Sequence, residues 1–153
     1  MYITKKALNE LTPDEYRACH YLNLRGEGMM LYSLIKNRQS SRSIAIMAWD
    51  DNKLLGWALL SPHGADANWY SSVHQKRKSR YVAQFYVRVP CRGKGVGAAL
   101  MREVNKLDAT PTVIPHDRDS ADFFASYRVV TDRTRRGLVD GAKRRKKVKL
   151  TMT

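Results

Sequence analysis

The fold of this chain is decided by one stretch, Gln84-Phe-Tyr-Val-Arg-Val-Pro-Cys-Arg-Gly-Lys-Gly-Val-Gly-Ala-Ala-Leu-Met101. It begins with strand-forming residues, is interrupted by Pro90 and a glycine-rich turn, and continues into apolar residues at helical spacing. We therefore predict a strand at Tyr81–Val89 and a helix from Gly95 onward. A strand, a tight turn and a helix in this order indicate an alternating α/β domain.

The turn Arg92-Gly-Lys-Gly-Val-Gly97 has the composition of a phosphate-binding loop. Its glycines let backbone N–H groups approach a ligand closely, and a helix start adds free N–H donors and the positive end of the helix dipole. It is not a P-loop, because no Gly-Lys-Ser/Thr follows four residues after the first glycine. It also lacks the spacing of the dinucleotide motif Gly-x-Gly-x-x-Gly. We therefore expect it to bind phosphate in a ligand of another kind.

The rest of the chain supplies the other elements of one domain, 1–153. A capping box at Thr12-Pro13-Asp14-Glu15 predicts a helix that runs to about Leu24. Strand formers on both sides of Asp50-Asp51-Asn52-Lys53 predict a β-hairpin. The further predicted elements are a strand at Tyr2–Thr4, a helix at Met29–Asn37, a strand at Thr112–Ile114, a helix at Asp119–Tyr127, a strand at Val129–Thr131 and, after a basic connection, a last strand within 133–153.

Composition narrows the class of protein. With 153 residues and 43% hydrophobic residues, the chain has the composition of one globular domain. No apolar run is long enough to span a membrane, and the N-terminus has no signal-peptide pattern, so we expect a cytoplasmic protein. The cysteines and histidines are scattered, and no metal site is predicted. The net charge is +14, and the basic residues are most frequent in Arg133–Lys147. This charge predicts a polyanionic partner, either a nucleic acid or an acidic protein.

The stretch from Gln84 to Met101 resembles the GCN5-related N-acetyltransferase (GNAT) superfamily. That family's signature is Arg/Gln-x-x-Gly-x-Gly/Ala after its fourth strand, and Arg92, Gly95 and Gly97 fill it. The resemblance implies an α/β fold, a single GNAT-like domain with a twisted mixed β-sheet and helices on both faces, and acetyl-CoA as cosubstrate. It further implies that main-chain groups of Val87 and Val89 hold the pantetheine arm and the acetyl carbonyl. The pyrophosphate would lie on the N–H groups of Arg92, Gly93, Lys94, Gly95, Val96 and Gly97.

The chain departs from the family at both catalytic positions. Many members carry a Glu three residues before the Val that matches Val87, where this chain has Gln84, which cannot act as a base at neutral pH. The base is then relayed by water, supplied elsewhere or absent, and His63 and His116 are candidates, although a structural role is favoured for each. Many members also carry a Tyr that protonates the departing thiolate, and the matching position in this chain is Ala125. Tyr127, two residues later, is a candidate acid for which a structural role is also favoured.

The predicted function is that of a GNAT-type N-acetyltransferase, an acyltransferase that moves an acetyl group from acetyl-CoA to an amine. The acceptor is unknown from the sequence. The basic segment favours an acceptor on an acidic or nucleic-acid-associated macromolecule. The alternative is a catalytically degenerate GNAT-fold protein that binds or inhibits a protein or nucleic acid, and Gln84 and Ala125 support that interpretation.

Overall fold

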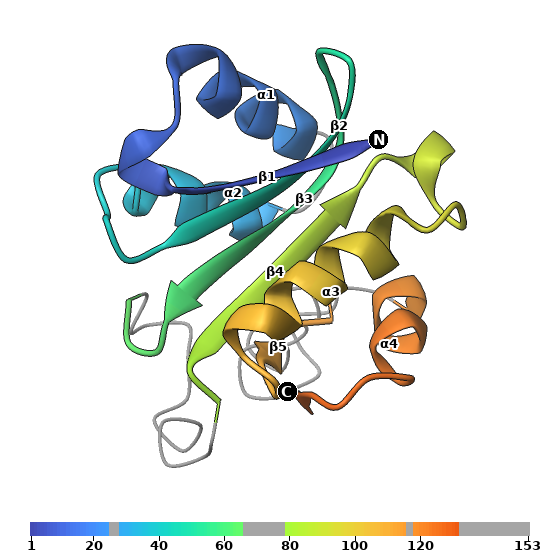
Figure 1. The fold of residues 1–153 in the computed structure, drawn as a ribbon. Helices are drawn as coiled ribbons and strands as arrows, with labels where there is room; N and C mark the ends of the chain where they lie inside the picture. The colour runs from blue at the N-terminus through green and yellow to red at the C-terminus, as the bar shows by residue number, and fades with distance from the viewer. Residues whose placement is uncertain (25–27, 66–78, 116–117, 132–153) are drawn as a thin grey trace, which may run out of the picture.

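A mixed β-sheet forms the centre of the molecule (Figure 1). A computed structural model describes residues 1–24, 28–65, 79–115 and 118–131, and these contain a 6-stranded sheet in the order β1-β2-β3-β4-β5-β6. Strands β1 to β4 pair antiparallel with one another, whereas β5 and β6 run parallel to β4. The strands are β1 (Tyr2–Ala7), β2 (Ile44–Asp50), β3 (Lys53–Pro62), β4 (Tyr81–Val87), β5 (Thr112–Val113) and β6 (Val130–Thr131).

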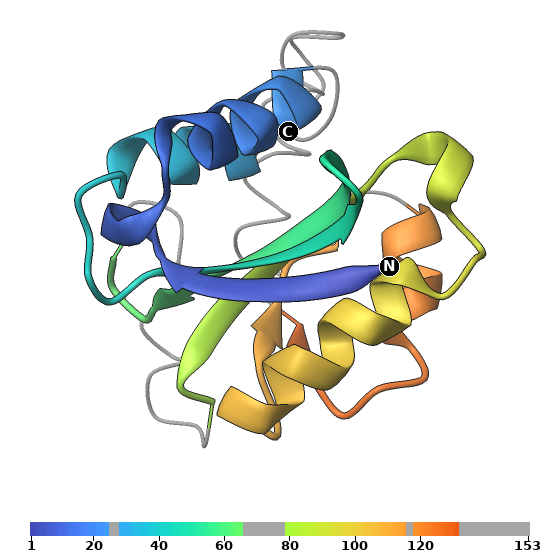
Figure 2. The ribbon, with the colours of Figure 1, turned by 45° about the horizontal axis from the view of Figure 1, so that its top comes forward.

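Helices cover both faces of this sheet, as predicted (Figure 2). Helices α1 (Pro13–Leu24) and α2 (Gly28–Lys36) lie on one face, and α3 (Val96–Leu107) and α4 (Arg118–Phe124) lie on the other. Short 3-10 turns, η1 (Leu8–Glu10) and η3 (Val89–Cys91), follow β1 and β4. Among the described residues no helix is long and apolar enough to cross a membrane.

The predicted start of α1 is confirmed by its hydrogen bonds. The backbone N–H of Thr12 donates to Glu15 Oε1 at 2.8 Å, and the N–H of Glu15 donates to Thr12 Oγ1 at 3.1 Å. These reciprocal bonds satisfy two N–H groups that the first helical turn leaves without acceptors. They also lower the pKa of the Glu15 carboxyl against the opposing effect of burial, together with Lys6 Nζ at 2.9 Å.

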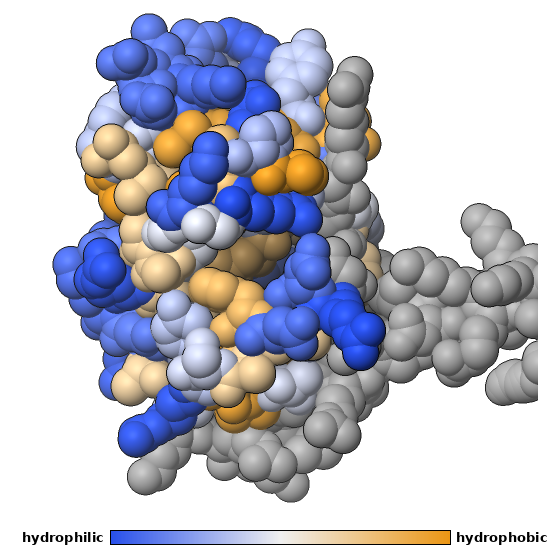
Figure 3. Space-filling model, turned by 90° about the vertical axis from the view of Figure 1, so that its right-hand side faces the viewer, coloured by the Kyte–Doolittle hydropathy of each residue, from blue (hydrophilic) through white to orange (hydrophobic). Residues whose placement is uncertain are grey.

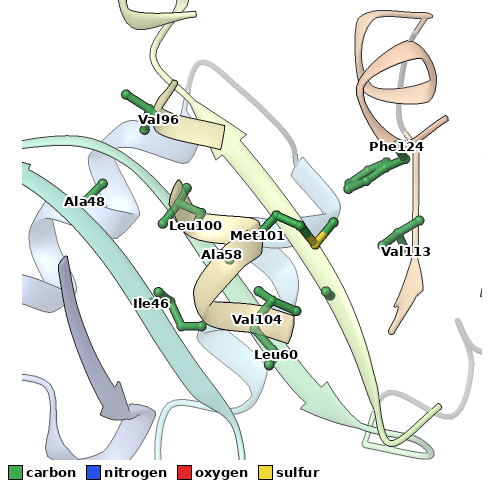
Figure 4. Packing of buried hydrophobic residues seen from close by; sticks show 11 residues of the cluster. Ile46, Ala48, Ala58, Leu60, Val96, Leu100, Met101, Val104, Val113 and Phe124 are labelled. Carbon is green, nitrogen blue, oxygen red and sulfur yellow. The ribbon is translucent and has the colours of Figure 1, made fainter. Parts of the chain in front are cut away.

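Each face of the sheet has its own core. Alternate residues of a strand point to opposite faces, so Ile46 and Ala58 pack under α3 with Leu100 and Val104 (Figure 4). Ala83 of β4 belongs to the same cluster. On the opposite face another set of buried residues packs under α1 and α2, namely Met30, Leu34, Met47, Trp57 and Leu59. Burying an aliphatic side chain of this size contributes about 1.5–3 kcal/mol, so the two clusters fix both helical layers on the sheet.

Two elements end at least two residues earlier than the sequence predicts, whereas α2 and β5 each end one residue early. Strand β4 ends at Val87 and not at Val89, because the N–H of Cys91 donates to Arg88 O at 2.8 Å and begins a 3-10 turn in which Pro90 has no N–H to offer a sheet. Helix α4 ends at Phe124 and not at Tyr127, although the N–H of Tyr127 still donates to Phe124 O at 3.0 Å. The predicted last strand and Arg133–Lys147 lie outside the described residues.

Asp108 joins the end of α3 to the start of β4. Its Oδ2 atom accepts hydrogen bonds from the backbone N–H groups of Arg80 at 2.7 Å and Tyr81 at 2.9 Å, and its Oδ1 atom accepts one from the N–H of Thr110 at 3.1 Å. The side chain is buried, with 5% of the residue exposed. One carboxylate therefore sets where β4 begins relative to the helix that follows it.

Replacing Asp108 should lower the stability of the fold. We expect Asp108→Ala to reduce the free energy of unfolding by about 2 kcal/mol, because backbone donors at the start of β4 lose a buried charged acceptor. Asp108→Asn, which keeps one acceptor oxygen, should be less destabilising. Urea unfolding measures both, with Asp50→Ala as the control, because the Asp50 side chain is exposed at the hairpin. A decrease in Asp108→Ala no larger than in the control would contradict this role.

Candidate functional site

The sheet opens beside β4. Strands β4 and β5 pair only at Val82–Thr112 and Ala83–Val113, and β4 continues to Val87 with β3 as its neighbour on the other side. Backbone groups of a strand point alternately to its two edges. The N–H of Arg88 donates to Leu55 O in β3 at 2.8 Å, so the backbone groups of Val87 and Phe85 point to the open edge. That edge is available to a ligand.

Arg92 ties the glycine-rich turn to the end of β4. Its Nε atom donates to Val87 O at 2.9 Å, and its guanidinium carbon lies 5.3 Å from the centre of the Tyr86 ring. A cation over an aromatic face and a charge-assisted hydrogen bond both hold the side chain against the strand. The Val87 carbonyl is thus already occupied, whereas the N–H of Arg92 completes the 3-10 turn by donating to Val89 O at 3.2 Å.

Helix α3 begins with uncapped N–H groups beside that turn. The N–H of Ala99 donates to Gly95 O at 3.0 Å, the first bond of the helix, so the N–H groups of Val96, Gly97 and Ala98 have no acceptor within it. Gly95 occupies the N-cap position without a side-chain cap, at φ +89°, and Gly93 has φ +75°. A Cβ built on either glycine meets nothing within 4 Å. These free donors, the helix dipole and the open space fit a pyrophosphate group.

Gly97 has a further role that the sequence did not reveal. A Cβ at this position would lie 3.1 Å from Cε1 and 3.3 Å from Cζ of Phe123, so α4 packs directly on the backbone of α3 here. The ring of Phe123 in turn lies 5.1 Å from the ring of Tyr127 and 6.1 Å from that of Phe85. The start of α3, the middle of β4 and Tyr127 therefore meet in one apolar cluster.

The elements that border the open edge carry cations. Arg92 and Lys94 are exposed in the turn, and Arg88 at the end of β4 donates through Nε to Leu54 O at 2.8 Å. Within the described part of the chain, strands β3, β4 and β5 and helix α2 carry no Asp or Glu. Figure 3, which faces this side of the molecule, shows hydrophobic residues gathered near the middle of the face with hydrophilic residues around them. An anion with an apolar arm matches this distribution.

The residues proposed from sequence for catalysis are separated by the structure. Gln84 is fully buried on the α1–α2 face, where its Nε2 atom donates to Ser33 Oγ at 3.2 Å, and its Oε1 atom has no hydrogen-bond partner among the described residues. Tyr127 lies on the opposite face, in the cluster with Phe123. Val87 lies on the open edge, whereas Val89 lies beyond β4 in η3 with 64% of its surface exposed.

His63 and His116, the histidines considered as possible bases, are not found at the open edge in the described part of the structure. His63 Nε2 lies 3.1 Å from Ser79 Oγ, next to the Pro62–Tyr81 pair at the start of β4. At a rise of roughly 3.3 Å per residue, that pair is about 20 Å along β4 from Val87. His116 lies outside the described residues. A histidine base at Val87 therefore finds no support in this geometry.

Sequence reasoning missed the partner of Gln84. Ser33 lies on the buried face of α2, among Met30 and Leu34, and its position in the sequence does not distinguish it from any residue of an amphipathic helix. The signal was a small hydroxyl side chain within a strongly apolar segment, Met29-Met-Leu-Tyr-Ser-Leu-Ile35. A buried polar side chain on such a face needs a hydrogen-bond partner, and here that partner is Gln84.

Comparison with known proteins identifies the family. A model of the acetyltransferase (GNAT) family matches residues 6–107, so the chain belongs to this family of acetyl-CoA-dependent N-acetyltransferases. Membership of this family makes acetyl-CoA the cosubstrate and an amine the acceptor. A search of curated protein sequences gives no match.

The chain is similar to several solved structures, and the first of those described next shares its fold, with a TM-score above 0.5. An aminoglycoside antibiotic 6'-N-acetyltransferase from Acinetobacter haemolyticus is 15% identical, with a TM-score of 0.52 over 100% of this chain and 92% of that one. An acyl-CoA N-acyltransferase from Pseudomonas aeruginosa is 21% identical, with a TM-score of 0.49 over 69% of this chain and 67% of that one. An aminoglycoside 6'-N-acetyltransferase solved with coenzyme A is 14% identical, with a TM-score of 0.46 over 70% of this chain and 54% of that one.

The left-handed backbone at Gly95 should make this position intolerant of a side chain. We expect Gly95→Ala to lower the free energy of unfolding by about 1–2 kcal/mol, because an L-residue is strained at positive φ. The control is Gly28→Ala at the start of α2, where a Cβ meets nothing within 4 Å and φ is not positive, so stability should stay unchanged or rise. Thermal and urea unfolding compare the two variants. Equal destabilisation of both would contradict the geometry at Gly95.

Proposed function

We propose that the open edge of β4 and the start of α3 together bind acetyl-CoA, and that the chain acetylates an amine carried by a macromolecule with acidic or nucleic-acid character. One observation carries the first part of the proposal. Uncapped N–H groups at the start of α3 lie directly after the stretch of β4 that β5 leaves unpaired. The cosubstrate would place its pyrophosphate on Arg92–Gly97 and its pantetheine arm along Phe85–Val87, with Val89 at the mouth of this path.

The main chain of Val87 would serve the reaction at the acetyl group. Bound acetyl-CoA supplies an acetyl carbon activated as a thioester. When an amine attacks the acetyl carbon, negative charge grows on the acetyl oxygen, and one fixed N–H donor at that oxygen contributes about 2.7–4 kcal/mol to lowering the barrier. The N–H of Val87 points to the open edge and is bonded to neither β3 nor Arg92, whose Nε takes the carbonyl.

Proton transfer would not depend on a carboxylate of the described sheet. Gln84 occupies the position three residues before Val87 and has no proton-accepting group. Tyr127 packs against the same apolar cluster as Val87, and we propose that it protonates the departing thiolate, because α4 ends at Phe124 and leaves Tyr127 outside the helix. The acceptor amine would therefore arrive in its neutral form and lose its proton after attack.

Charge reversal at Lys94 tests the proposed pyrophosphate site. We expect Lys94→Glu to weaken acetyl-CoA binding by at least about tenfold, because a carboxylate would replace an ammonium group beside the phosphates. Arg42→Glu makes the same change of charge on an exposed side chain before β2, at the opposite end of the sheet, and should leave affinity unchanged. Isothermal titration calorimetry at two salt concentrations measures both. Equal affinities in the two variants would refute the assignment.

A salt series tests the macromolecular acceptor. If Arg133–Lys147 docks a polyanion, replacing Arg144, Arg145, Lys146 and Lys147 by Ala should reduce the log–log slope of affinity against salt by about 0.7–0.9 for each phosphate that the variant no longer binds. Binding to tRNA, duplex DNA and an acidic protein is measured with wild type and with the variant, whose acetyl-CoA affinity serves as the internal control. Unchanged binding to all three would show that this charge does not dock the acceptor.

A further inference from the structure

The face of β4 that packs under α1 and α2 is lined by neutral polar groups. Alternate residues Gln84 and Tyr86 point to the α1–α2 face, where Gln84 meets Ser33 of α2 and the neighbouring Trp57 donates through Nε1 to Asn23 Oδ1 at 2.6 Å. Gln84, Ser33 and Asn23 are each at most 1% exposed. All of these groups are amides, hydroxyls or an indole. None of them carries charge at any pH near neutrality.

The described elements next to Gln84, namely β3, β4 and α2, carry no carboxylate. Cys19 lies in the cluster under α1, and burial raises the pKa of its thiol, with the negative charge of Glu15 acting in the same direction. Glu15 is itself held by Lys6 and Thr12, at the start of α1. The elements that pack here also carry the phenols Tyr16, Tyr32 and Tyr86 and the imidazole of His20, whose ring centre lies 6.0 Å from that of Tyr16. His63 contacts Ser79 at the far end of β4.

The side-chain oxygen of Gln84, Oε1, accepts no hydrogen bond from the described residues. Because Nε2 is engaged by Ser33 Oγ, the amide is oriented and Oε1 faces surroundings in which no described group donates to it. Such an oxygen is costly to bury, and an N–H donor from a ligand would satisfy it. The amide oxygen can accept a hydrogen bond from a neutral amine, yet it cannot remove a proton or balance the full charge of an ammonium ion.

We infer that Gln84 is a positioning residue that selects weakly basic primary amines, such as the α-amino group of a peptide, against strongly basic amines such as the side chain of lysine. The inference rests on the proposed function, because it places the acceptor amine on Gln84 Oε1. The amine nitrogen forms a bond to the acetyl carbon, the carbon–sulfur bond breaks, and the proton released by nitrogen ends on the thiol of coenzyme A or in water. No other reactant is needed.

The size of the selection follows from the neutral fraction of each amine. At pH 7.4 an α-amino group with a pKa of about 7.7 is roughly one-third neutral, whereas a lysine side chain with a pKa of about 10.4 is about one-thousandth neutral. A site without a carboxylate therefore meets roughly 300 times more reactive α-amine than reactive lysine at equal concentration. A carboxylate at position 84 would reduce this difference, because it accepts the proton of a bound ammonium group.

Two forms of one peptide test the inference. The first has a free N-terminus and an acetylated lysine, and the second has an acetylated N-terminus and a free lysine. For wild type we expect kcat/KM at pH 7.4 to favour the first by at least about 30-fold, after allowance for the greater nucleophilicity of the more basic amine. The rate on the first should level off near about pH 9, and the rate on the second should keep rising to about pH 10. Coenzyme A release and product mass measure both.

Variants of Gln84 separate positioning from mere structure. Gln84→Glu should reduce the preference at least tenfold, Gln84→Met should raise KM for the peptide at unchanged acetyl-CoA affinity, and Ser33→Ala should act in the same direction as Gln84→Met because the amide is no longer oriented. Gln39→Glu, the same change on an exposed side chain after α2, should leave the preference as in wild type. Melting temperatures and acetyl-CoA binding establish that each variant is folded.

The outcomes distinguish a failure of the inference about Gln84 from a failure of the proposed acetyl transfer. Equal or preferential use of the lysine peptide by wild type, or a preference that Gln84→Glu leaves unchanged while the variant remains folded, would overturn the inference and leave the proposed function standing. Transfer to neither peptide and to no amine in a series of small primary amines, in protein that binds acetyl-CoA, would overturn the proposed acetyl transfer and the inference with it.

Discussion

The early end of the pairing between β4 and β5 is the constraint on which the site depends. After Ala83 the two strands share no ladder bond, and the backbone of β4 up to Val87 is supported by β3 alone. Unpaired edge groups in a sheet interior are costly unless another partner satisfies them. A ligand with polar groups spaced along a strand, such as an amide-containing arm, can satisfy these unpaired backbone groups of β4.

The other edge of β4 is held in place by close contact with β3. A Cβ on Gly56, which pairs with Val87, would lie 2.9 Å from Tyr86 O and 3.0 Å from Val87 Cα, so only glycine allows β3 to approach β4 this closely. Asp108 holds the opposite end of β4, and Arg92 holds the turn. A rigid strand with one free edge is a suitable support for a donor that must meet a developing charge accurately.

Most of the fold could be predicted from the sequence, because the patterns that indicate its helices, strands and turns are local. The capping box at Thr12, the turn residues between β2 and β3, and the strand–turn–helix order around Pro90 each depend on neighbours in the chain. The site was readable only in part. The glycine-rich turn indicated its free N–H groups, whereas the contact of Gly97 with Phe123 and the bond from Gln84 to Ser33 join residues far apart in sequence. The end of β4 at Val87 depended on a 3-10 turn that strand propensity does not register.

The replacement of a carboxylate by Gln84 alters which acceptors the site favours more than whether it can react. A glutamate here would draw ammonium groups from solution and deprotonate them, whereas an amide leaves deprotonation to the acceptor's own basicity. In the proposed function the exposed cations Arg92 and Lys94 would act in the same direction, because they would attract the phosphates of the cosubstrate and repel a positively charged acceptor. A net charge of +14 extends this repulsion over the chain as a whole. An acceptor that brings a weakly basic amine on an anionic carrier avoids both obstacles, because its carrier is attracted while its amine is already neutral.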